Sequence, residues 1–251
     1  EGYLKVAGLN NFNQISLRSN SVNNLKLPLV SPPLSANINL SDLSSYSTYF
    51  SHSVIIKNDG SAKVIGSNSP NQIFGNLQKK ISNWTRLKNK ESFISAVCGN
   101  SYVLCMLNSN TCETSLGCYW NGKNKGDLIF IDIGDRTPIA LFGGRKMAAA
   151  IDDKGDIIAI TETTILSEDH KGEIISLPNN EKATFVSCLE KTLIILSNEG
   201  KVYEYNIGNP GEKEIEEIEE LKEIRIKTLS GTWRHCLAVT EDGEVYGRGF
   251  N

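Results

Sequence analysis

Cysteine and histidine are the residues of this chain best suited to metal or nucleophilic chemistry. The six cysteines are Cys98, Cys105, Cys112, Cys118, Cys188 and Cys236, and the three histidines are His52, His170 and His235. Zinc sites are usually built from close pairs such as Cys-x-x-Cys, and the sequence holds no such pair. Cys105, Cys188 and Cys236 lie in or beside apolar runs, a setting typical of small buried side chains in a reducing compartment. The sequence therefore favours buried thiols over a metal site, with a hairpin disulfide between Cys112 and Cys118 as an alternative.

Recognisable catalytic motifs are missing from the sequence. It has no Gly-x-Ser-x-Gly elbow, no phosphate-binding Gly-x-x-x-x-Gly-Lys loop and no dinucleotide fingerprint. His52 and His235 occupy one position of a repeat, which favours a repeated structural bond over catalysis. His170 stands beside Glu168 and Asp169 in a polar turn, and these offer too few ligands for a metal. We predict no catalytic, cofactor-binding or metal-binding residue, no cofactor, and a protein that is not an enzyme.

Composition narrows the class of protein further. The chain has 251 residues, of which 39% are hydrophobic and 22% charged, so it can bury a core. A net charge of −3 disfavours direct binding of nucleic acid, which requires a basic face. No apolar run is long enough for a membrane span, and no signal segment follows Glu1. We expect a cytoplasmic or nuclear protein that is neither secreted nor bound to a membrane, and a sequence that is a piece of a longer chain.

A unit of about 45 residues recurs along the sequence. Its apolar runs are anchored, at spacings of 50, 45, 45 and 43 residues, at His52, Tyr102, Met147, Thr192 and His235. Eight residues after four of these anchors a glycine follows a polar residue, at Gly60, Gly155, Gly200 and Gly243. Runs of apolar, often β-branched residues form strands, and a polar-Gly dipeptide supplies the positive φ of a tight hairpin turn. Each unit therefore predicts a β-hairpin.

Two segments depart from this pattern. The second unit lacks the glycine, and we predict a longer loop from Asn108 to Ser115, with the next strand restarting at Gly117. The acidic segment Glu212–Arg225 carries an apolar residue at every third position. We interpret it as a connector between units, in which some local helix is allowed, and the alternative is a run of successive helical turns. Its acidic run indicates a solvated face, and a basic partner is the other interpretation.

The last unit resembles the repeat of the regulator of chromosome condensation (RCC1-like) family. That repeat has a glycine, a His-Ser/Thr pair, an apolar strand, Asp-Gly, an aromatic-containing strand and Gly-x-Asn. The matching residues are Gly231, His235, Asp242, Gly243, Tyr246, Gly249 and Asn251. The first full unit matches again at Ser51-His52, Asp59-Gly60, Gly66 and Asn68. The resemblance implies a β-propeller of four-stranded blades, commonly seven in this family.

The number of repeats sets the predicted architecture. The opening Gly2-Tyr3 is similar to the second half of a unit, and Gly2 and Gly243 are equivalent positions. The distance between them holds five repeats. We therefore predict an all-β fold in which residues 1–251 form a single propeller domain or a fragment of one, with about five blades of a larger, seven-bladed propeller.

Repeat equivalence also predicts a binding face. Residues Gly231–His235 resemble a Gly-Trp-Arg-His-Thr element that photoreceptor members of the family repeat to build a tryptophan cluster. The positions equivalent to Trp233 are Phe50, Asn100, Arg145 and Glu190, so no such cluster is expected here. Equivalent positions on consecutive blades should form an arc on one face, and aromatic and arginine residues are favoured in interfaces. We predict partner binding by Phe50, Arg145, Trp233 and Arg234, the alternative being that they only cap the blade ends.

These observations favour a non-catalytic protein-interaction propeller, serving as a scaffold or assembly component. The resemblance implies an alternative, a guanine-nucleotide exchange factor for a Ran-like small GTPase. Such a factor displaces nucleotide and needs no catalytic triad. The wedge-like hairpin of the family's exchange factors has its nearest candidate in the loop at 108–117. The expected partner is another protein, either a small GTPase or a large assembly.

Overall fold

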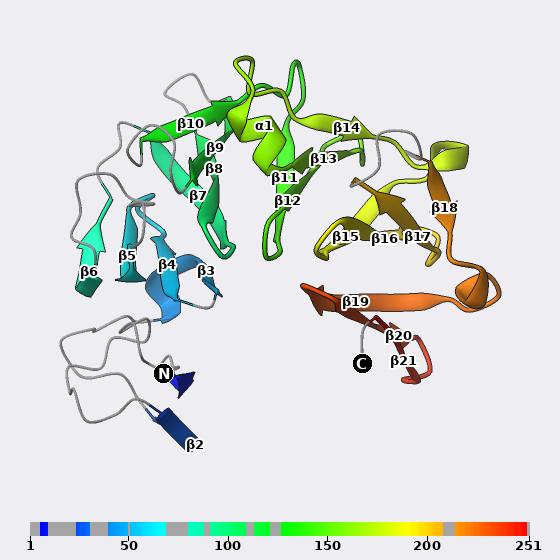
Figure 1. Cartoon of the computed structure of the whole chain (residues 1–251), viewed down its shortest axis with the longest axis horizontal. Coiled ribbons are helices and arrows are strands. Elements are labelled where there is room, and N and C mark those ends of the chain that lie inside the picture. Colours follow the sequence, from blue (N-terminus) through cyan, green and yellow to red (C-terminus); the bar gives the residue numbers. More distant parts are fainter. Residues whose placement is uncertain are drawn as a thin grey trace. The chain divides into compact units, whose positions relative to one another are not determined.

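The computed structural model describes residues 6–9, 24–30, 40–49, 51–68, 80–87, 91–108, 113–120, 127–207 and 214–249 (Figure 1). The chain divides into two compact units, Glu1–Phe130 and Ile131–Asn251. Within the described ranges the structure contains no helix with the length and apolar character needed to span a membrane. Nearly all of the described elements are strands, which confirms the all-β prediction, whereas a single domain stays a prediction.

The first unit consists of antiparallel sheets whose strands follow one another in chain order. A two-stranded sheet joins β1 (Val6–Leu9) to β2 (Asn24–Val30). The single-turn 3-10 helix η2 (Leu40–Asp42) leads into the next sheet. That sheet contains β3 (Leu43–Tyr49), β4 (His52–Lys57), β5 (Ala62–Ser67) and β6 (Lys80–Arg86). The third contains β7 (Ser92–Cys98), β8 (Tyr102–Asn108), β9 (Thr114–Trp120) and β10 (Leu128–Ile131).

The second unit repeats the same arrangement in three sheets (Figure 1). The first contains β11 (Pro138–Gly143), β12 (Ala148–Asp152), β13 (Ile157–Ile160) and β14 (Glu173–Ile175). The second contains β15 (Ala183–Cys188), β16 (Thr192–Ser197), β17 (Val202–Asn206) and β18 (Ile215–Glu217). The third contains β19 (Ile226–Thr232), β20 (His235–Thr240) and β21 (Val245–Gly249). The helix α1 (Glu162–Leu166) lies between β13 and β14 of the first sheet, and the 3-10 turns η4 (Pro178–Asn180) and η5 (Glu219–Leu221) connect the three sheets.

The hairpins predicted from the repeat are present. The repeat anchors lie at the start of the second strand of each sheet or directly before it, and that strand pairs with the third. The four turn glycines, Gly60, Gly155, Gly200 and Gly243, have φ of +74°, +88°, +80° and +88°. Only glycine adopts this left-handed region without strain, which explains why the sequence repeats it there.

Apolar side chains from neighbouring sheets form the cores. One cluster lies between the sheets β3–β6 and β7–β10, and includes Val54, Val64 and Cys105. In the second unit one cluster lies between β11–β14 and β15–β18, and another between β15–β18 and β19–β21. The central strands β12 and β16 are buried on both sides, as their continuous apolar runs indicate.

A repeated backbone hydrogen bond ties three of the sheets to the sheet that follows within the same unit. The carbonyl oxygen of the turn glycine accepts from the first strand of the following sheet: Phe93 donates to Gly60, Ala183 to Gly155 and Ile226 to Gly200, each at 2.9 Å. Around Gly243 the described part of the chain offers no such contact. The contacts between neighbouring sheets therefore recur with the same 45-residue period as the strands.

One predicted segment needs correction, and the structure decides between two interpretations of another. Strand β9 begins at Thr114 and Asn108 still belongs to β8, so the loop is shorter than predicted. The segment at 212–225 contains strand β18 and the single turn η5, and forms no amphipathic helix in its described residues. Its regularly spaced apolar residues divide between two cores, because Ile215 packs against one cluster while Ile218, Leu221 and Ile224 pack against another.

Candidate functional site

Three hairpin turns of the second unit place the predicted binding residues at one end of their sheets. The turns join the first and second strands, β11–β12, β15–β16 and β19–β20. The first two are closed by bonds from Gly144 N to Met147 O, 3.0 Å, and from Leu189 N to Thr192 O, 2.9 Å. The third is flanked by the pair Thr232–His235. The six residues at the tips, which we call the turn surface, are Arg145, Lys146, Glu190, Lys191, Trp233 and Arg234.

Trp233 holds two arginines against its ring. The guanidinium carbon of Arg145 lies 4.4 Å from the ring centroid, and that of Arg234 lies 4.7 Å from it. Such contacts contribute about 0.5–1 kcal/mol each at exposed sites, and they fix the indole relative to both side chains. The ring still exposes part of its surface, because Trp233 is 39% accessible to solvent.

Glu190 joins this group from the sheet between the other two. Its Oε2 accepts a hydrogen bond from Arg234 Nε at 3.0 Å. That bond, the charge of Arg234, a hydrogen bond from Trp233 and the charge of Arg145 together lower the pKa of Glu190. Glu190 is therefore ionised at neutral pH. An ion pair this exposed adds little stability, so its main effect is to orient Arg234.

The backbone at Trp233 is strained. Its φ is +57°, in the left-handed region that bulky residues rarely adopt. A parallel bridge between Leu189 and Trp233 holds this backbone to the neighbouring sheet. Strain of this kind costs about 1–3 kcal/mol and collects at functional sites.

The other predicted positions are not part of this group. Phe50 lies outside the described residues. Asn100 is exposed in the β7–β8 turn of the first unit, where its Nδ2 donates to Ser101 Oγ at 3.3 Å. The structure thus brings together Arg145, Trp233 and Arg234 with Glu190, and partner binding by these residues stays a prediction.

A second set of polar residues, at the opposite ends of the same sheets, was missed from the sequence. Asp152, Ser197 and Thr240 each stand three residues before a turn glycine. Their side-chain oxygens accept backbone N–H groups of the turn, from Asp156 at 2.8 Å, Lys201 at 3.3 Å and Glu244 at 3.0 Å. The sequence signal that could have revealed them is a hydroxyl or carboxylate side chain three residues before each of these three glycines. These bonds support the hairpin turns.

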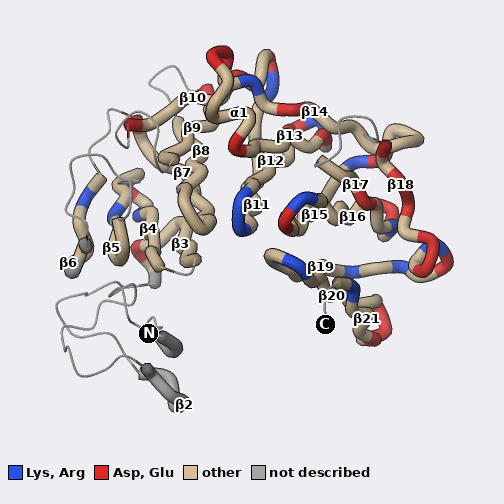
Figure 2. The backbone as a smooth tube through the Cα atoms, viewed as in Figure 1, with Lys and Arg blue, Asp and Glu red and all other residues tan. Residues whose placement is uncertain are grey.

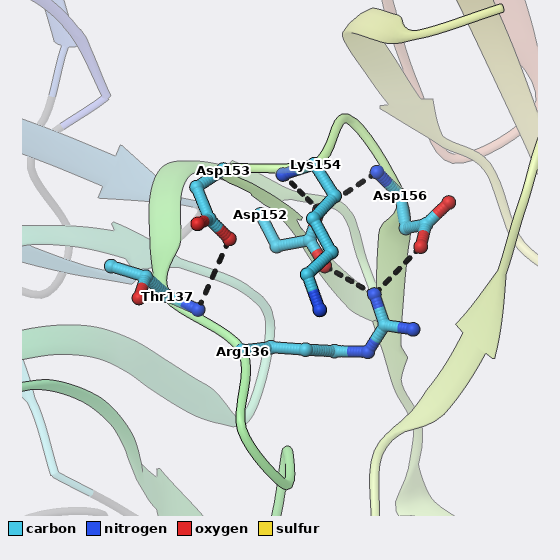
Figure 3. A network of polar contacts seen from close by, with 6 residues as sticks. All are labelled: Arg136, Thr137, Asp152, Asp153, Lys154 and Asp156. Atoms are coloured by element: carbon cyan, nitrogen blue, oxygen red, sulfur yellow. Dashed lines mark hydrogen bonds and ion pairs between the residues drawn. The ribbon is translucent and has the colours of Figure 1, made fainter. Parts of the chain in front are cut away.

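Figure 3 shows the most elaborate of these turns. Arg136 Nη1 donates to Asp152 and, at 2.7 Å, to Asp156 Oδ2, while the backbone of Lys154 donates to Asp152 at 3.0 Å. Partial burial would raise the pKa of Asp156, but hydrogen bonds from Arg136 and Ser176 and the charge of Arg136 outweigh it and lower the pKa. Asp152 is fully buried. Because the carboxylates bind the chain's own donors, we interpret this cluster as a structural clamp.

The histidines differ between equivalent positions. His52 is fully buried, and its Nε2 lies 3.4 Å from the carbonyl oxygen of Tyr102 at the start of β8. Burial lowers the pKa of His52 to about 4, only partly offset by that bond, so the ring is neutral at physiological pH. His235 is exposed on β20 and forms no side-chain hydrogen bond with the described residues. The predicted structural bond is therefore present at His52 alone.

The cysteines of the described ranges are buried and unpaired, at Cys98, Cys105, Cys118, Cys188 and Cys236. Burial raises the pKa of each thiol, to about 12 for Cys98 and Cys188. Cys112 lies outside the described residues, but its proposed partner Cys118 is a free thiol, so the alternative of a Cys112–Cys118 disulfide is wrong. Within the same ranges no three His, Cys, Asp or Glu side chains lie close enough to hold a metal ion.

Comparison with known proteins places this geometry in context. No protein-family model matches the chain. A stretch of 88 residues is 33% identical to the ultraviolet-B receptor UVR8 of Arabidopsis thaliana, covering 32% of this chain and 20% of the receptor. Human WBSCR16 matches in structure with a TM-score of 0.69 and 15% identity, over 98% of this chain and 70% of that protein.

Prp20p of Saccharomyces cerevisiae matches with a TM-score of 0.74 and 9% identity, over 98% of this chain and 65% of Prp20p. In a second structure, bound to Kap60, the same yeast protein is named RCC1. The fold is that of the RCC1-like repeat propellers. Five sheets of three or four antiparallel strands in this chain match seven-bladed propellers over most of the length of those proteins, which confirms the predicted resemblance and fold class.

Proposed function

We propose that this RCC1-like chain is a non-catalytic protein-interaction module and that the turn surface is its docking site. The observation that carries the proposal is the partly exposed ring of Trp233, held by arginines from two sheets. Tryptophan and arginine dominate the binding energy of protein interfaces, particularly where neighbouring contacts hold them in place. The left-handed backbone at Trp233 lowers the stability of the folded chain. Backbone strain of this kind collects at functional sites, which further supports a role in binding.

Relatives with this fold support a protein as the partner. Prp20p is described as binding Gsp1p and histones, and its second structure contains Kap60. We extend this to the present chain only as a class: its partner is another protein, encountered in the cytoplasm or nucleus. The chain spans 65% of Prp20p and its match to UVR8 spans 20% of that receptor, so the activities of those whole proteins are not transferred.

The test is a quantitative capture experiment with a double substitution, Trp233→Ala with Arg234→Ala. We expect the variant to keep its fold by circular dichroism and to lose about tenfold or more of the affinity for proteins that the unaltered chain captures. Lys154→Ala, in a turn at the opposite end of the sheets, is the control and should capture normally. Equal capture by the double variant and the unaltered chain would end the proposal.

A guanine-nucleotide exchange factor for a Ran-like GTPase is the second candidate. The observation that favours it is the structural match to Prp20p, which binds Gsp1p. Release of a fluorescent guanine nucleotide from Gsp1p, measured with and without this chain, tests it directly. Faster release would support exchange activity, and an unchanged rate across a range of chain concentrations would exclude it for this GTPase.

A further inference from the structure

Charge is distributed unevenly between the two ends of the sheets in the second unit. At the turn surface the cations Arg145, Lys146, Lys191 and Arg234 stand against the single carboxylate of Glu190. Figure 2 shows the lysine and arginine colouring at the turns after β11, β15 and β19. The side chains of Lys146 and Lys191 are exposed. This end of the unit therefore presents a positive surface around an aromatic ring.

The opposite ends of the sheets are predominantly negative. There the turns between the second and third strands carry seven carboxylates and two lysines, namely Asp152, Asp153, Asp156, Glu199, Glu241, Asp242 and Glu244 with Lys154 and Lys201. Arg136 neutralises part of this charge by pairing with Asp152 and Asp156, and the carboxylates still outnumber the cations. The positive character of the turn surface is thus a local feature of a chain whose net charge is −3. Such a surface steers and orients a partner of opposite charge.

Arg145 has donors that no described carboxylate engages. It stacks on Trp233, yet none of the described carboxylates lies within ion-pair distance of it. Glu190, which comes from the neighbouring turn, is engaged by Arg234. A guanidinium has five N–H donors, and stacking on a ring leaves its edge free to bind a carboxylate in bidentate fashion. Arg145 is therefore positioned to receive an acidic group from outside.

We infer that the turn surface binds an acidic polypeptide segment of a partner protein, with carboxylates on Arg145, Lys146 and Lys191 and an apolar side chain on the exposed part of Trp233. This inference rests on the proposed docking function and names the chemistry of its partner. A nucleic acid fits less well, because a phosphate backbone needs a longer basic track than these turns provide and would approach the acidic remainder of the unit.

The test uses three fluorescein-labelled peptides that differ only in charge: four glutamates around a central leucine, and the same peptide with four glutamines or four lysines. Fluorescence anisotropy with the full chain should show binding of the glutamate peptide about tenfold or more tighter than of the glutamine peptide, weakening with added salt. The lysine peptide should not bind. Equal affinity for all three, or no binding of the glutamate peptide, would overturn the inference.

A pair of charge reversals locates the binding. Lys146→Glu with Lys191→Glu leaves the Trp233 stack in place and should abolish binding of the glutamate peptide. Lys154→Glu with Lys227→Glu, which alters the same charge away from the turn surface, is the matched control and should bind within about twofold of the unaltered chain. Equal loss in both variants would show nonspecific attraction and overturn the inference.

The same variants separate this inference from the proposed function. If capture of natural partners needs Trp233 but tolerates the Lys146 and Lys191 reversals, the docking function holds and the acidic partner is wrong. If capture is indifferent to Trp233 as well, both fail. Sedimentation of the chain alone gives one further outcome: self-association that the reversals abolish would identify a second copy as the occupant and overturn a separate partner.

Discussion

At the scale of single residues, Trp233 combines strain with interaction. Its φ of +57° disfavours any residue with a Cβ, while two arginine stacks hold the ring in place. A left-handed backbone costs an L-residue about 1–2 kcal/mol, whereas glycine adopts it freely. Stability of the turn therefore favours glycine at this position, whereas docking requires the tryptophan ring. Substitutions can measure the two effects separately.

Replacing Trp233 by glycine and by alanine tests the strain. Both variants remove the ring, but only Trp233→Gly relieves the backbone, so we expect it to be more stable than Trp233→Ala by about 1 kcal/mol. Urea denaturation of the two variants measures the difference. An alanine variant at least as stable as the glycine variant would mean that the turn carries no strain.

His52 gives the first unit a specific dependence on pH. Burial lowers the pKa of this ring from 6.5 to about 4, so the unfolded chain binds a proton that the folded chain excludes. Stability is therefore complete above the unfolded pKa and is lost as pH falls from 6.5 toward 4, by at most about 3 kcal/mol.

The test compares the unaltered chain with His52→Gln. The variant keeps a polar side chain of similar reach but cannot titrate, so its free energy of unfolding should fall less between pH 7 and pH 4.5. Denaturant melts at several pH values report the slope. Identical slopes for the two proteins would show that His52 does not set the acid response.

At the scale of elements, packing between neighbouring sheets decides what a repeat position contributes. Val202 of β17 and Val245 of β21 are equivalent, yet Val202 is 1% exposed and Val245 61% exposed. Ile194 and Leu237 on the adjacent strands show the same contrast, at 3% and 46%. Equivalent apolar side chains are therefore buried in the sheet β15–β18 and exposed in the sheet β19–β21.

Two alanine substitutions measure this contrast. Val202→Ala should lower the free energy of unfolding by about 2 kcal/mol because it leaves a cavity in the cluster between β15–β18 and β19–β21. Val245→Ala should change it by less than about 0.5 kcal/mol. Thermal or urea melts check both, and a similar cost for the two would contradict the burial pattern.

Close approach of two sheets explains one glycine beside the turn surface. A Cβ on Gly144 would lie 2.2 Å from the carbonyl oxygen of Cys188, whereas one on Gly247 would meet only Leu237, at 3.5 Å. Gly144→Ala should therefore cost about 2 kcal/mol or more and displace the Arg145 turn, while Gly247→Ala should be nearly neutral. Denaturation of both variants tests the stability, and the part of the tryptophan fluorescence that Trp233→Ala removes reports on the turn.

At the scale of the whole molecule, the repeat made most of the fold predictable. Its apolar runs and polar-Gly turns are local signals, so β4, β12, β16 and β20 could be located from sequence. The acidic segment was harder, because Ile215 and Ile218 face different cores and their spacing imitates a helix. The 45-residue period rather than any single motif carried the information.

The repeat also made the positions of the candidate-site residues predictable, but not the contacts between their side chains. Equivalent repeat positions placed Arg145 and Trp233 at the same end of their sheets, which flank the sheet β15–β18, although 88 residues separate them. The ion pair of Glu190 with Arg234 and the network of Arg136 with Asp152 depend on side-chain directions that spacing does not encode. Those contacts are seen only in the structure.

The most direct test of docking at the turn surface is the affinity of a captured partner for three proteins: the unaltered chain, Trp233→Ala with Arg234→Ala, and Lys154→Ala. We predict a loss of about tenfold or more for the first variant alone, with both variants folded. Affinities that agree for all three proteins would contradict the account.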